Sequence, residues 1–216
     1  MEKVFGVGLN KTGTTTLGQC MRVFGSRHLS HSEEFARLYR YGQKTKLLAI
    51  ANDFDSFEDW PWPLMYKEAA VEFPDAKFIL TVRKSAQVWL KSLVTHSYKL
   101  PPEENYHELI YGYKYPLGHK AYHLEFYNNH NASVIDHFRD QPGRLSVLCW
   151  ENGDGWPELC NFLGVDTPDV PFPRSGATKD WNVPPSRIFH NRLLAIMAVG
   201  ARNELVNNSS EHFKVT

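Results

Sequence analysis

Apolar runs alternate with polar turns and with helical periodicity along most of this chain. Continuous apolar runs of strand length occupy 4–9, 77–82 and 144–150. Such runs are typical of parallel strands that are covered on both faces. Helical patterns follow the first two runs, over 15–24 and from Ser85 onwards. This order predicts an α/β fold of three layers (α/β/α), with helices on both faces of a central, mostly parallel sheet.

The same patterns predict the remaining elements. They are a short strand at 26–29 and helices at 32–41, 64–73, 118–139, 156–163 and 188–206. Residues 207–216 are polar, so we expect a frayed tail there. Because no repeat or low-complexity linker divides the chain, residues 1–216 are expected to form one domain.

Composition limits the possible functions. Of the 216 residues, 42% are hydrophobic and 22% charged, which is ordinary for a globular domain. Lysine plus arginine equals aspartate plus glutamate, at 24 each, so no overall charge favours nucleic acid or an anionic membrane surface. No apolar run approaches the roughly 20 residues of a membrane span. With three scattered cysteines, we expect a cytoplasmic protein with reduced thiols.

The first predicted strand, turn and helix form the stretch Lys3–Leu17, which reads KVFGVGLNKTGTTTL. The first N–H groups of a helix have no intrahelical partners and carry partial positive charge, so they can bind a phosphate or sulfate. Lys11 adds a mobile charge, and Gly13 lets the backbone approach an oxyanion closely. The turn therefore indicates a P-loop-like anion-binding loop. A capped helix without a ligand is the simpler alternative.

Two common phosphate-binding loops do not fit this turn. A Walker A loop has a lysine directly after its second glycine, whereas Thr14 follows Gly13 here. A Rossmann fingerprint requires a glycine three residues after Gly8, at the position of Lys11. The loop must belong to another class of anion-binding site.

Two later stretches could complete a site. At 52–63 the sequence NDFDSFEDWPWP interleaves acidic and aromatic residues, and an acid against aromatic surface can acquire the raised pKa of a general base. An exposed acidic loop explains this pattern equally well. Arg83 follows the 77–82 strand, where open α/β sheets bind ligands, and Ser92 lies in the next helix. A solvated arginine is the alternative for Arg83.

Together these motifs resemble the sulfotransferases that use 3′-phosphoadenosine 5′-phosphosulfate (PAPS), especially their short, bacterial-type members. The resemblance rests on KTGTTT at 11–16, FPDAKFILTVR at 73–83 and WLKSL at 89–93. It implies an enzyme that transfers a sulfuryl group from PAPS to a hydroxyl or amine of a small molecule. It also implies adenosine 3′,5′-bisphosphate (PAP) as the product, with no metal. The turn would be the phosphosulfate-binding loop.

The resemblance implies how this chain would hold the nucleotide. Lys11 would be catalytic, and Arg83 and Ser92 would bind the 3′-phosphate. Ser85 remains an alternative to Ser92, because Lys84-Ser85 replaces the usual Asp-Pro or Asn-Pro and the interval to Ser92 is one residue longer. The loop contacts to the 5′-phosphosulfate would come from Asn10, Lys11, Thr12, Gly13, Thr14, Thr15 and Thr16. A later basic loop that could close over the 3′-phosphate contains Arg174 and Lys179.

The sequence defines the residues that would bind the acceptor less clearly than those that would bind the nucleotide. The resemblance assigns the general base to Asp59 of an Asp-x-Pro segment, with Asp55 and His31 as alternatives. The residues expected to bind the acceptor are Asp55, Trp60, Trp62 and Tyr98. The tyrosine-rich stretch 106–115 could line the acceptor pocket or pack between helices. These aromatic residues favour a ring-bearing acceptor.

Two other functions stay open. A P-loop kinase of a small metabolite would require magnesium and a lysine after Gly13. A non-catalytic domain could keep the fold and bind a nucleotide or a protein. His119 and His123 lie one helical turn apart, but no glutamate of an H-E-x-x-H motif accompanies them, so we expect no metal site.

Overall fold

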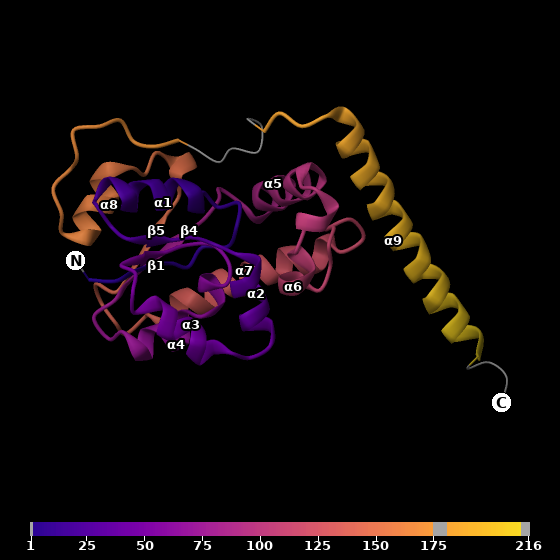
Figure 1. Cartoon of the computed structure of the whole chain (residues 1–216), viewed down its shortest axis with the longest axis horizontal. Coiled ribbons are helices and arrows are strands. Elements are labelled where there is room, and N and C mark those ends of the chain that lie inside the picture. Colours follow the sequence, from indigo (N-terminus) through magenta and orange to yellow (C-terminus); the bar gives the residue numbers. More distant parts are fainter. Residues whose placement is uncertain (1, 175–180, 213–216) are drawn as a thin grey trace.

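Within residues 2–174 and 181–212, which this computed structural model describes, five strands form a central sheet (Figure 1). Side chains are described as far as residue 201. The strand order is β2-β3-β1-β4-β5, and all four pairings are parallel. The strands are β1 (Val4–Gly6), β2 (His28–Leu29), β3 (Ser56–Phe57), β4 (Lys77–Thr81) and β5 (Leu145–Leu148). The predicted α/β fold with a parallel sheet is confirmed.

Helices cover both faces of this sheet, which gives the three predicted layers (Figure 1). Leu17, Cys20 and Met21 pack with Ile79 on the face covered by α1 (Thr14–Val23) and α8 (Trp156–Leu163). On the other face the core contains side chains from α3 (Lys44–Ala51), α4 (Tyr66–Glu72) and α7 (Lys120–His137), with α2 (Glu33–Arg40) packed against it.

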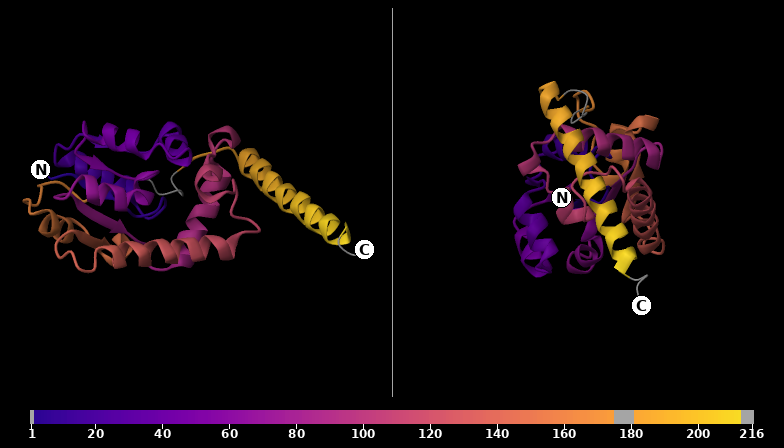
Figure 2. Two further views of the ribbon diagram at one scale, coloured as in Figure 1. Left: turned by 90° about the horizontal axis from the view of Figure 1, so that it is seen from below. Right: turned by 90° about the vertical axis from the view of Figure 1, so that its right-hand side faces the viewer.

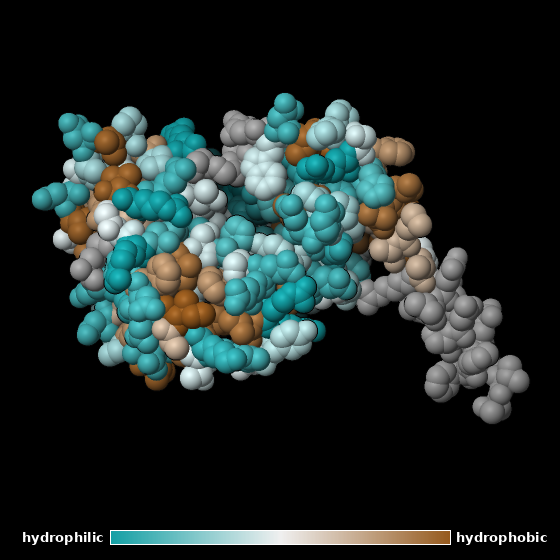
Figure 3. Space-filling model, viewed as in Figure 1, coloured by the Kyte–Doolittle hydropathy of each residue, from teal (hydrophilic) through white to brown (hydrophobic). Residues whose placement is uncertain are grey.

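The other described helices are α5 (Ala86–Lys99), α6 (His107–Tyr111), α9 (Pro185–His212) and the 3-10 helices η1 (Trp62–Leu64), η2 (Pro102–Glu104) and η3 (Trp150–Asn152). The first part of α9 packs against α5, and the rest projects from the molecule (Figure 2). Hydrophobic side chains that are exposed on this first part include Phe189 and Ile196. Figure 3 shows hydrophobic surface at this end of the molecule. No described helix combines the length and apolar character of a membrane span.

The sequence prediction differs from the structure at several places, of which three bear on the sheet and the C-terminal helix. It missed α3 and β3, because the segment Lys44–Ala51 has little helical amphipathicity and β3 is only two residues long within an acidic stretch. The predicted strand at 4–9 ends at Gly6, although Val7 and Leu9 are fully buried as the chain leaves the sheet. Residues 207–212, for which the sequence predicts a frayed tail, continue α9 to His212. Extending an existing helix costs far less than starting one.

Candidate active site

A cavity of about 920 Å³ lies at the carboxyl edge of the sheet. Residues that follow four of the parallel strands line it. They are 10–16 after β1, Asp59 and Trp60 after β3, Val82 and Arg83 after β4, and Trp150, Glu151, Gly153 and Asp154 after β5. Open α/β sheets bind their ligands at this edge because successive loops converge there. The sequence-predicted anion loop, acid and arginine therefore share one cavity.

The loop between β1 and α1 depends on two glycines. Gly13 precedes the first turn of α1 with φ 97°, a left-handed conformation that glycine adopts without strain. A Cβ at Gly13 would collide with the indole ring of Trp150, whose Nε1 donates a 3.2 Å hydrogen bond to the Gly13 carbonyl. A Cβ at Gly8 would collide with Thr81. The loop before α1 therefore packs closely against Thr81 at the end of β4 and against Trp150 after β5.

Some polar side chains of this loop form hydrogen bonds within the protein, whereas others are exposed. Thr12 is buried, and its hydroxyl donates to the Leu9 carbonyl at 2.6 Å and lies 2.6 Å from the hydroxyl of Thr81. The side chain of Asn10 accepts a 2.6 Å hydrogen bond from the Tyr111 hydroxyl. These two residues line the cavity but use their side chains to shape the loop. Thr15 is exposed at the first turn of α1.

Lys11 and Asp59 share an unusual backbone conformation. Of the non-glycine residues described, these two alone have positive φ, at 68° and 63°. Such conformations cost free energy and are concentrated at functional sites. Burial lowers the pKa of Lys11 to about 8, although Asp59 opposes this shift. The Lys11 ammonium also lies 5.8 Å from the ring centre of Trp181.

The Asp59 carboxyl has the properties of a general base. Burial, together with the charge of Glu58, raises its pKa to about 6. Its two oxygens are oriented by hydrogen bonds, from the Trp60 N–H to Oδ1 at 2.8 Å and from the Thr14 hydroxyl to Oδ2 at 3.3 Å. His31 and Lys11 oppose the upward shift of the pKa. At neutral pH the group is ionised and can accept a proton.

A second acid, Glu58, lies buried beside Asp59. The Ser30 hydroxyl donates to Glu58 Oε1 at 2.6 Å, and His28 Nε2 lies 3.6 Å from the same oxygen. Burial opposes the ionisation of Glu58, but the nearby His28 and the hydrogen bond from Ser30 hold its pKa below the ordinary value. The Nδ1 of His28 is 2.8 Å from the Ser56 hydroxyl. Two neighbouring acids therefore have pKa values shifted in opposite directions, a pattern that separates a base from a fixed charge.

Arg83 joins the ends of β4 and β5 to the anion loop. Its Nη1 donates to the Lys11 carbonyl at 2.9 Å, and its Nη2 lies 2.6 Å from Glu151 Oε1. The other oxygen of Glu151 accepts from the Lys84 N–H at 3.1 Å. The hydrogen bond from Arg83 lowers the pKa of Glu151. Sequence reasoning missed this role of Glu151, because only the parallel pairing of β4 and β5 brings the two residues together.

A family model for the sulfotransferase domain matches residues 3–181. The chain belongs to this sulfotransferase family. It is also similar to Ava biosynthesis cluster protein M of Aspergillus versicolor, with 25% identity over 224 residues that cover 84% of this chain and 83% of that protein. The resemblance inferred from the sequence motifs is confirmed. Family membership supports a sulfotransferase-type activity on a small-molecule acceptor.

In this sulfotransferase-family protein, Ser85 and Ser92 are the two alternative predictions for the contact with the 3′-phosphate. The hydroxyl of Ser85 accepts a 3.2 Å hydrogen bond from the Val88 N–H and caps α5. Ser92, one helical turn beyond Val88, lines the cavity. The geometry thus favours Ser92 as a ligand-binding residue. Arg174 lines the cavity too, whereas Lys179 lies outside the described residues.

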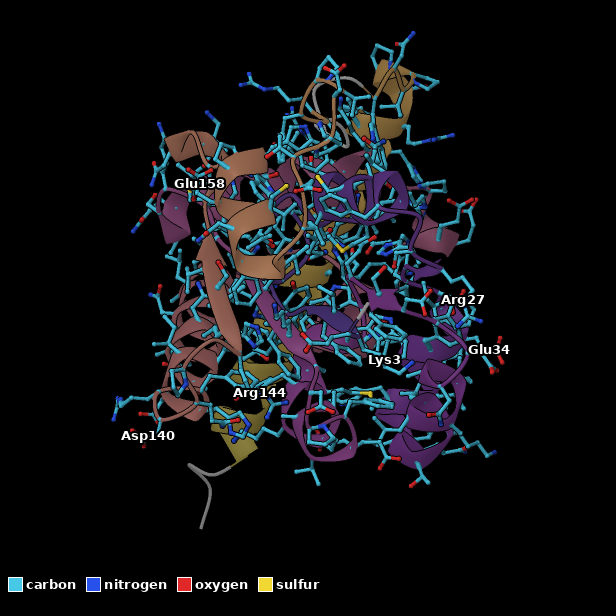
Figure 4. The ribbon with its side chains drawn as sticks, turned by 90° about the vertical axis from the view of Figure 1, so that its left-hand side faces the viewer. Lys3, Arg27, Glu34, Asp140, Arg144 and Glu158 are labelled. Atoms are coloured by element: carbon cyan, nitrogen blue, oxygen red, sulfur yellow. The ribbon has the colours of Figure 1, made fainter. Side chains whose placement is uncertain are left out.

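Three residues predicted to bind the acceptor do not line the described cavity. Asp55 precedes β3 at the opposite edge of the sheet, where it forms a 3.2 Å ion pair with Arg27. Arg27 lies near Lys3 at this edge (Figure 4), and Lys3 caps nearby carbonyls. Because of this position, Asp55 is no longer an alternative general base. The predicted position of Asp55 was wrong because β3 separates it from Asp59.

The other two corrections concern aromatic residues. Trp62 is completely buried in the core, with its ring centre 4.7 Å from that of Phe57. Tyr98 packs beside Tyr115 at a ring-centre distance of 6.1 Å. Trp60, in contrast, lines the cavity as predicted. Sequence alone could not distinguish these rings because their burial depends on the packing of distant segments.

The acceptor end contains residues that sequence reasoning did not select. Those that line the cavity include Thr95, His96, Leu100, Glu104, His107 and Trp181. In the tyrosine-rich stretch, Tyr106 lines the cavity, whereas Tyr111 packs against Trp60. His119 and His123 lie outside the cavity lining, and the described residues contain no cluster of three metal-ligating side chains.

Proposed function

We propose that this sulfotransferase-family protein uses PAPS as donor and transfers its sulfuryl group to a hydroxyl or amine of a small, ring-bearing acceptor. The observation that supports this proposal best is the single cavity shared by the 10–16 loop, Asp59 and Arg83. The donor set fits the nucleotide, because helix N–H groups and Lys11 stand at one position and the Arg83 guanidinium at another. Bound PAPS would supply the sulfuryl group and leave as PAP.

In the proposed reaction, alignment and charge stabilisation supply most of the catalysis. Asp59 accepts the proton of the acceptor as the acceptor oxygen or nitrogen attacks sulfur. Lys11 and the N–H groups at the start of α1 stabilise the negative charge that develops on the departing phosphate. Because burial places the pKa of Lys11 near 8 and that of Asp59 near 6, both groups carry their charges between these values.

Recognition of the 3′-phosphate is assigned to Arg83 and Ser92, with Arg174 at the rim of the cavity. Calorimetric titration tests this part of the proposal, because PAP and adenosine 5′-monophosphate differ only by the 3′-phosphate. We expect PAP to bind at least tenfold more tightly, which corresponds to about 1.4 kcal/mol. Ser92→Ala should reduce the preference. Lys84→Met removes an exposed neighbouring cation that lies outside the cavity lining and serves as the matched control. Equal affinities for the two nucleotides would contradict the assignment.

Transfer itself is tested by incubating the protein with sulfur-labelled PAPS and a panel of phenols and alcohols. Lys11→Met should reduce label transfer by about 10² or more, because loss of one oxyanion-stabilising group has that effect in other acyl- and phosphoryl-transfer enzymes. A kinase would instead require ATP and magnesium. PAP binding without transfer to any acceptor would support the non-catalytic alternative.

A further inference from the structure

Helix α9 has apolar side chains on two opposite faces. On the inner face, Ala195 is buried, and Val199 lies so close to Gly118 that a Cβ added there would collide with it. The outer face presents four large apolar side chains that are 45–70% exposed, namely Phe189, Leu193, Ile196 and Met197. The apolar face of a helix is ordinarily buried against another element. Within the described part of the chain, the outer face of α9 has no such neighbour.

The four exposed side chains form one continuous stripe. Their positions are i, i+4, i+7 and i+8, and Gly200 follows at i+11 on the same face. We call these five residues the outer stripe. It contains no charged residue. A Cβ at Gly200 would meet no atom within 4 Å, so the stripe has a gap in its side-chain layer there. Figure 2 shows that α9 crosses one end of the molecule with its outer side uncovered.

The order of large and small residues along the outer stripe is self-complementary. In an antiparallel pair of α9 helices with the two-fold axis midway along the stripe, Phe189 of each copy lies opposite Gly200 of the other. Leu193 then lies opposite Ile196. The largest side chain meets the gap in both halves of the pair, as helix packing with ridges in grooves requires. A parallel pair would instead place Phe189 against Phe189 and leave two glycines facing each other.

We propose that a second copy of this chain packs on the outer stripe, so that two α9 helices form an antiparallel pair between the two globules. The contact is isologous, since the same surface is used by both copies. Four side chains supply only part of the roughly 800 Å² per partner that stable interfaces bury, so we expect association in the micromolar range. The dilute protein is then a monomer, and its unfolding measures the single chain. The proposal is independent of the proposed function, because the outer stripe contains no residue that lines the cavity.

Sedimentation velocity of the full chain between about 1 and 200 μM tests this association. We expect the mean mass to rise from that of the monomer towards twice that value. Ile196→Glu places a charge in the stripe and should raise the dissociation constant by about tenfold or more. Val71→Glu introduces the same charge at an 82% exposed position of α4 and is the matched control. A chain that stays monomeric throughout overturns the proposal, as does unchanged association of Ile196→Glu.

The gap at Gly200 permits a variant that does not weaken the helix. Leucine favours helices more than glycine does, so dilute Gly200→Leu should melt at the same temperature as the unaltered chain or higher. Its association should nevertheless weaken by about tenfold or more, because Phe189 of the other copy no longer fits into the gap. Equal or stronger association of Gly200→Leu would contradict the antiparallel arrangement.

Disulfide cross-linking determines the direction of the two helices. The three native cysteines are buried, so cysteines introduced on the outer stripe can be followed separately. A mixture of Phe189→Cys and Gly200→Cys chains should cross-link. Phe189→Cys alone should not, because its two copies lie about 16 Å apart along an antiparallel pair. Efficient cross-linking of Phe189→Cys with itself would show a parallel pair and overturn the arrangement.

A lipid surface is the other possible occupant of an exposed apolar stripe. Interfacial helices have Lys and Arg along both flanks of their apolar face, whereas Arg192 is the single basic residue of this kind that borders the stripe among the described residues. Flotation with vesicles of phosphatidylcholine and phosphatidylserine tests this alternative, and we expect no binding. If the monomeric chain floats with the vesicles and Ile196→Glu does not, the stripe contacts lipid and the proposal is overturned.

Discussion

At the scale of single residues, burial acts differently on the two acids that follow β3. Glu58 is held ionised by Ser30 and His28, whereas Asp59 has a pKa of about 6 because its charge is poorly solvated and lies beside that of Glu58. The acidic and aromatic stretch 52–63 indicated a general base but gave no reason to separate these neighbours. Their different partners support the proposal that Asp59 accepts the proton while Glu58 stays charged beside it.

Removing the charge of Glu58 should change the pH dependence of the reaction. In Glu58→Gln the pKa of Asp59 falls, so Asp59 stays deprotonated to lower pH. The acid limb of the pH profile of kcat/KM should move to lower pH, by up to about one unit. Glu34→Gln, on the surface (Figure 4), is the control. An acid limb that stays in place would remove Glu58 from the electrostatics of the site.

Neutralising Asp59 should reduce activity and increase stability. The folded pKa of about 6 exceeds the ordinary value of 3.8, so the folded state binds this proton more tightly than the unfolded state. The stabilisation that protonated Asp59 gives the folded state is complete below about pH 4 and is lost as pH rises through about 6. Asp59→Asn should therefore raise the free energy of unfolding at pH 8 by on the order of 2 kcal/mol. At pH 4 the gain should vanish.

Thermal denaturation at both pH values measures this effect on stability, and an assay at neutral pH measures the loss of activity. We expect a decrease of about 10² or more in kcat, as for loss of a general base. Full activity of Asp59→Asn would contradict the assignment of the base. A lower melting temperature at pH 8 would contradict the electrostatic argument.

At the scale of elements, the active site depends on the loop between β1 and α1 and on its contacts with the ends of β4 and β5. Gly13 lies against Trp150, and Arg83 connects the Lys11 carbonyl with Glu151. The sequence predicted the loop from its glycines and threonines, since helix N-termini bind anions for local reasons. Its partners after β5 depend on sheet topology and could not be predicted in the same way.

Gly13→Ala should disrupt this loop. The new methyl group would collide with Trp150 in addition to the cost of a positive φ, and we expect PAP affinity to fall at least tenfold. Gly25→Ala is the matched control, because Gly25 also has positive φ, at 77°, but no atom lies within 4 Å of its added Cβ. That control should lose about 1 kcal/mol of stability and keep PAP affinity. Equal effects of both variants on PAP affinity would exclude the collision as the cause.

At the scale of the whole molecule, the start of α9 is fixed to the globule although most of this helix projects from it (Figure 2). Asn191 anchors it: the amide donates to the carbonyls of Tyr98 at 2.9 Å and Leu100 at 2.7 Å. The Tyr115 hydroxyl donates to its oxygen at 3.3 Å. Asn191 is fully buried, so these contacts hold α9 on α5 next to the cavity.

Asn191→Ala should detach this anchor. It removes three hydrogen bonds and leaves buried polar groups unpaired, which should cost about 2–4 kcal/mol of stability in denaturant unfolding. Leu193→Ala, on an exposed position of the same helix, should change stability by less than about 0.5 kcal/mol. Equal stabilities of the two variants would show that α9 is not anchored through Asn191.

The sequence by itself determined the α/β class, the anion loop and the candidate roles of Lys11, Asp59 and Arg83. Apolar periodicity and helix-terminus chemistry are local properties, so a linear sequence contains them. It did not determine that Asp55 and Trp62 lie away from the cavity. These positions depend on β3, which is too short to leave a periodic signal.

Only the tertiary structure decided which distant groups meet. Glu151 reaches Arg83 because β4 and β5 are paired, and His96 meets His107 because α5 and α6 border the same cavity. The pKa of Asp59 depends in the same way on burial among residues from several loops. Burial and electrostatic coupling arise from the packed molecule, and for this reason the sequence could not show which of its predicted residues share the cavity.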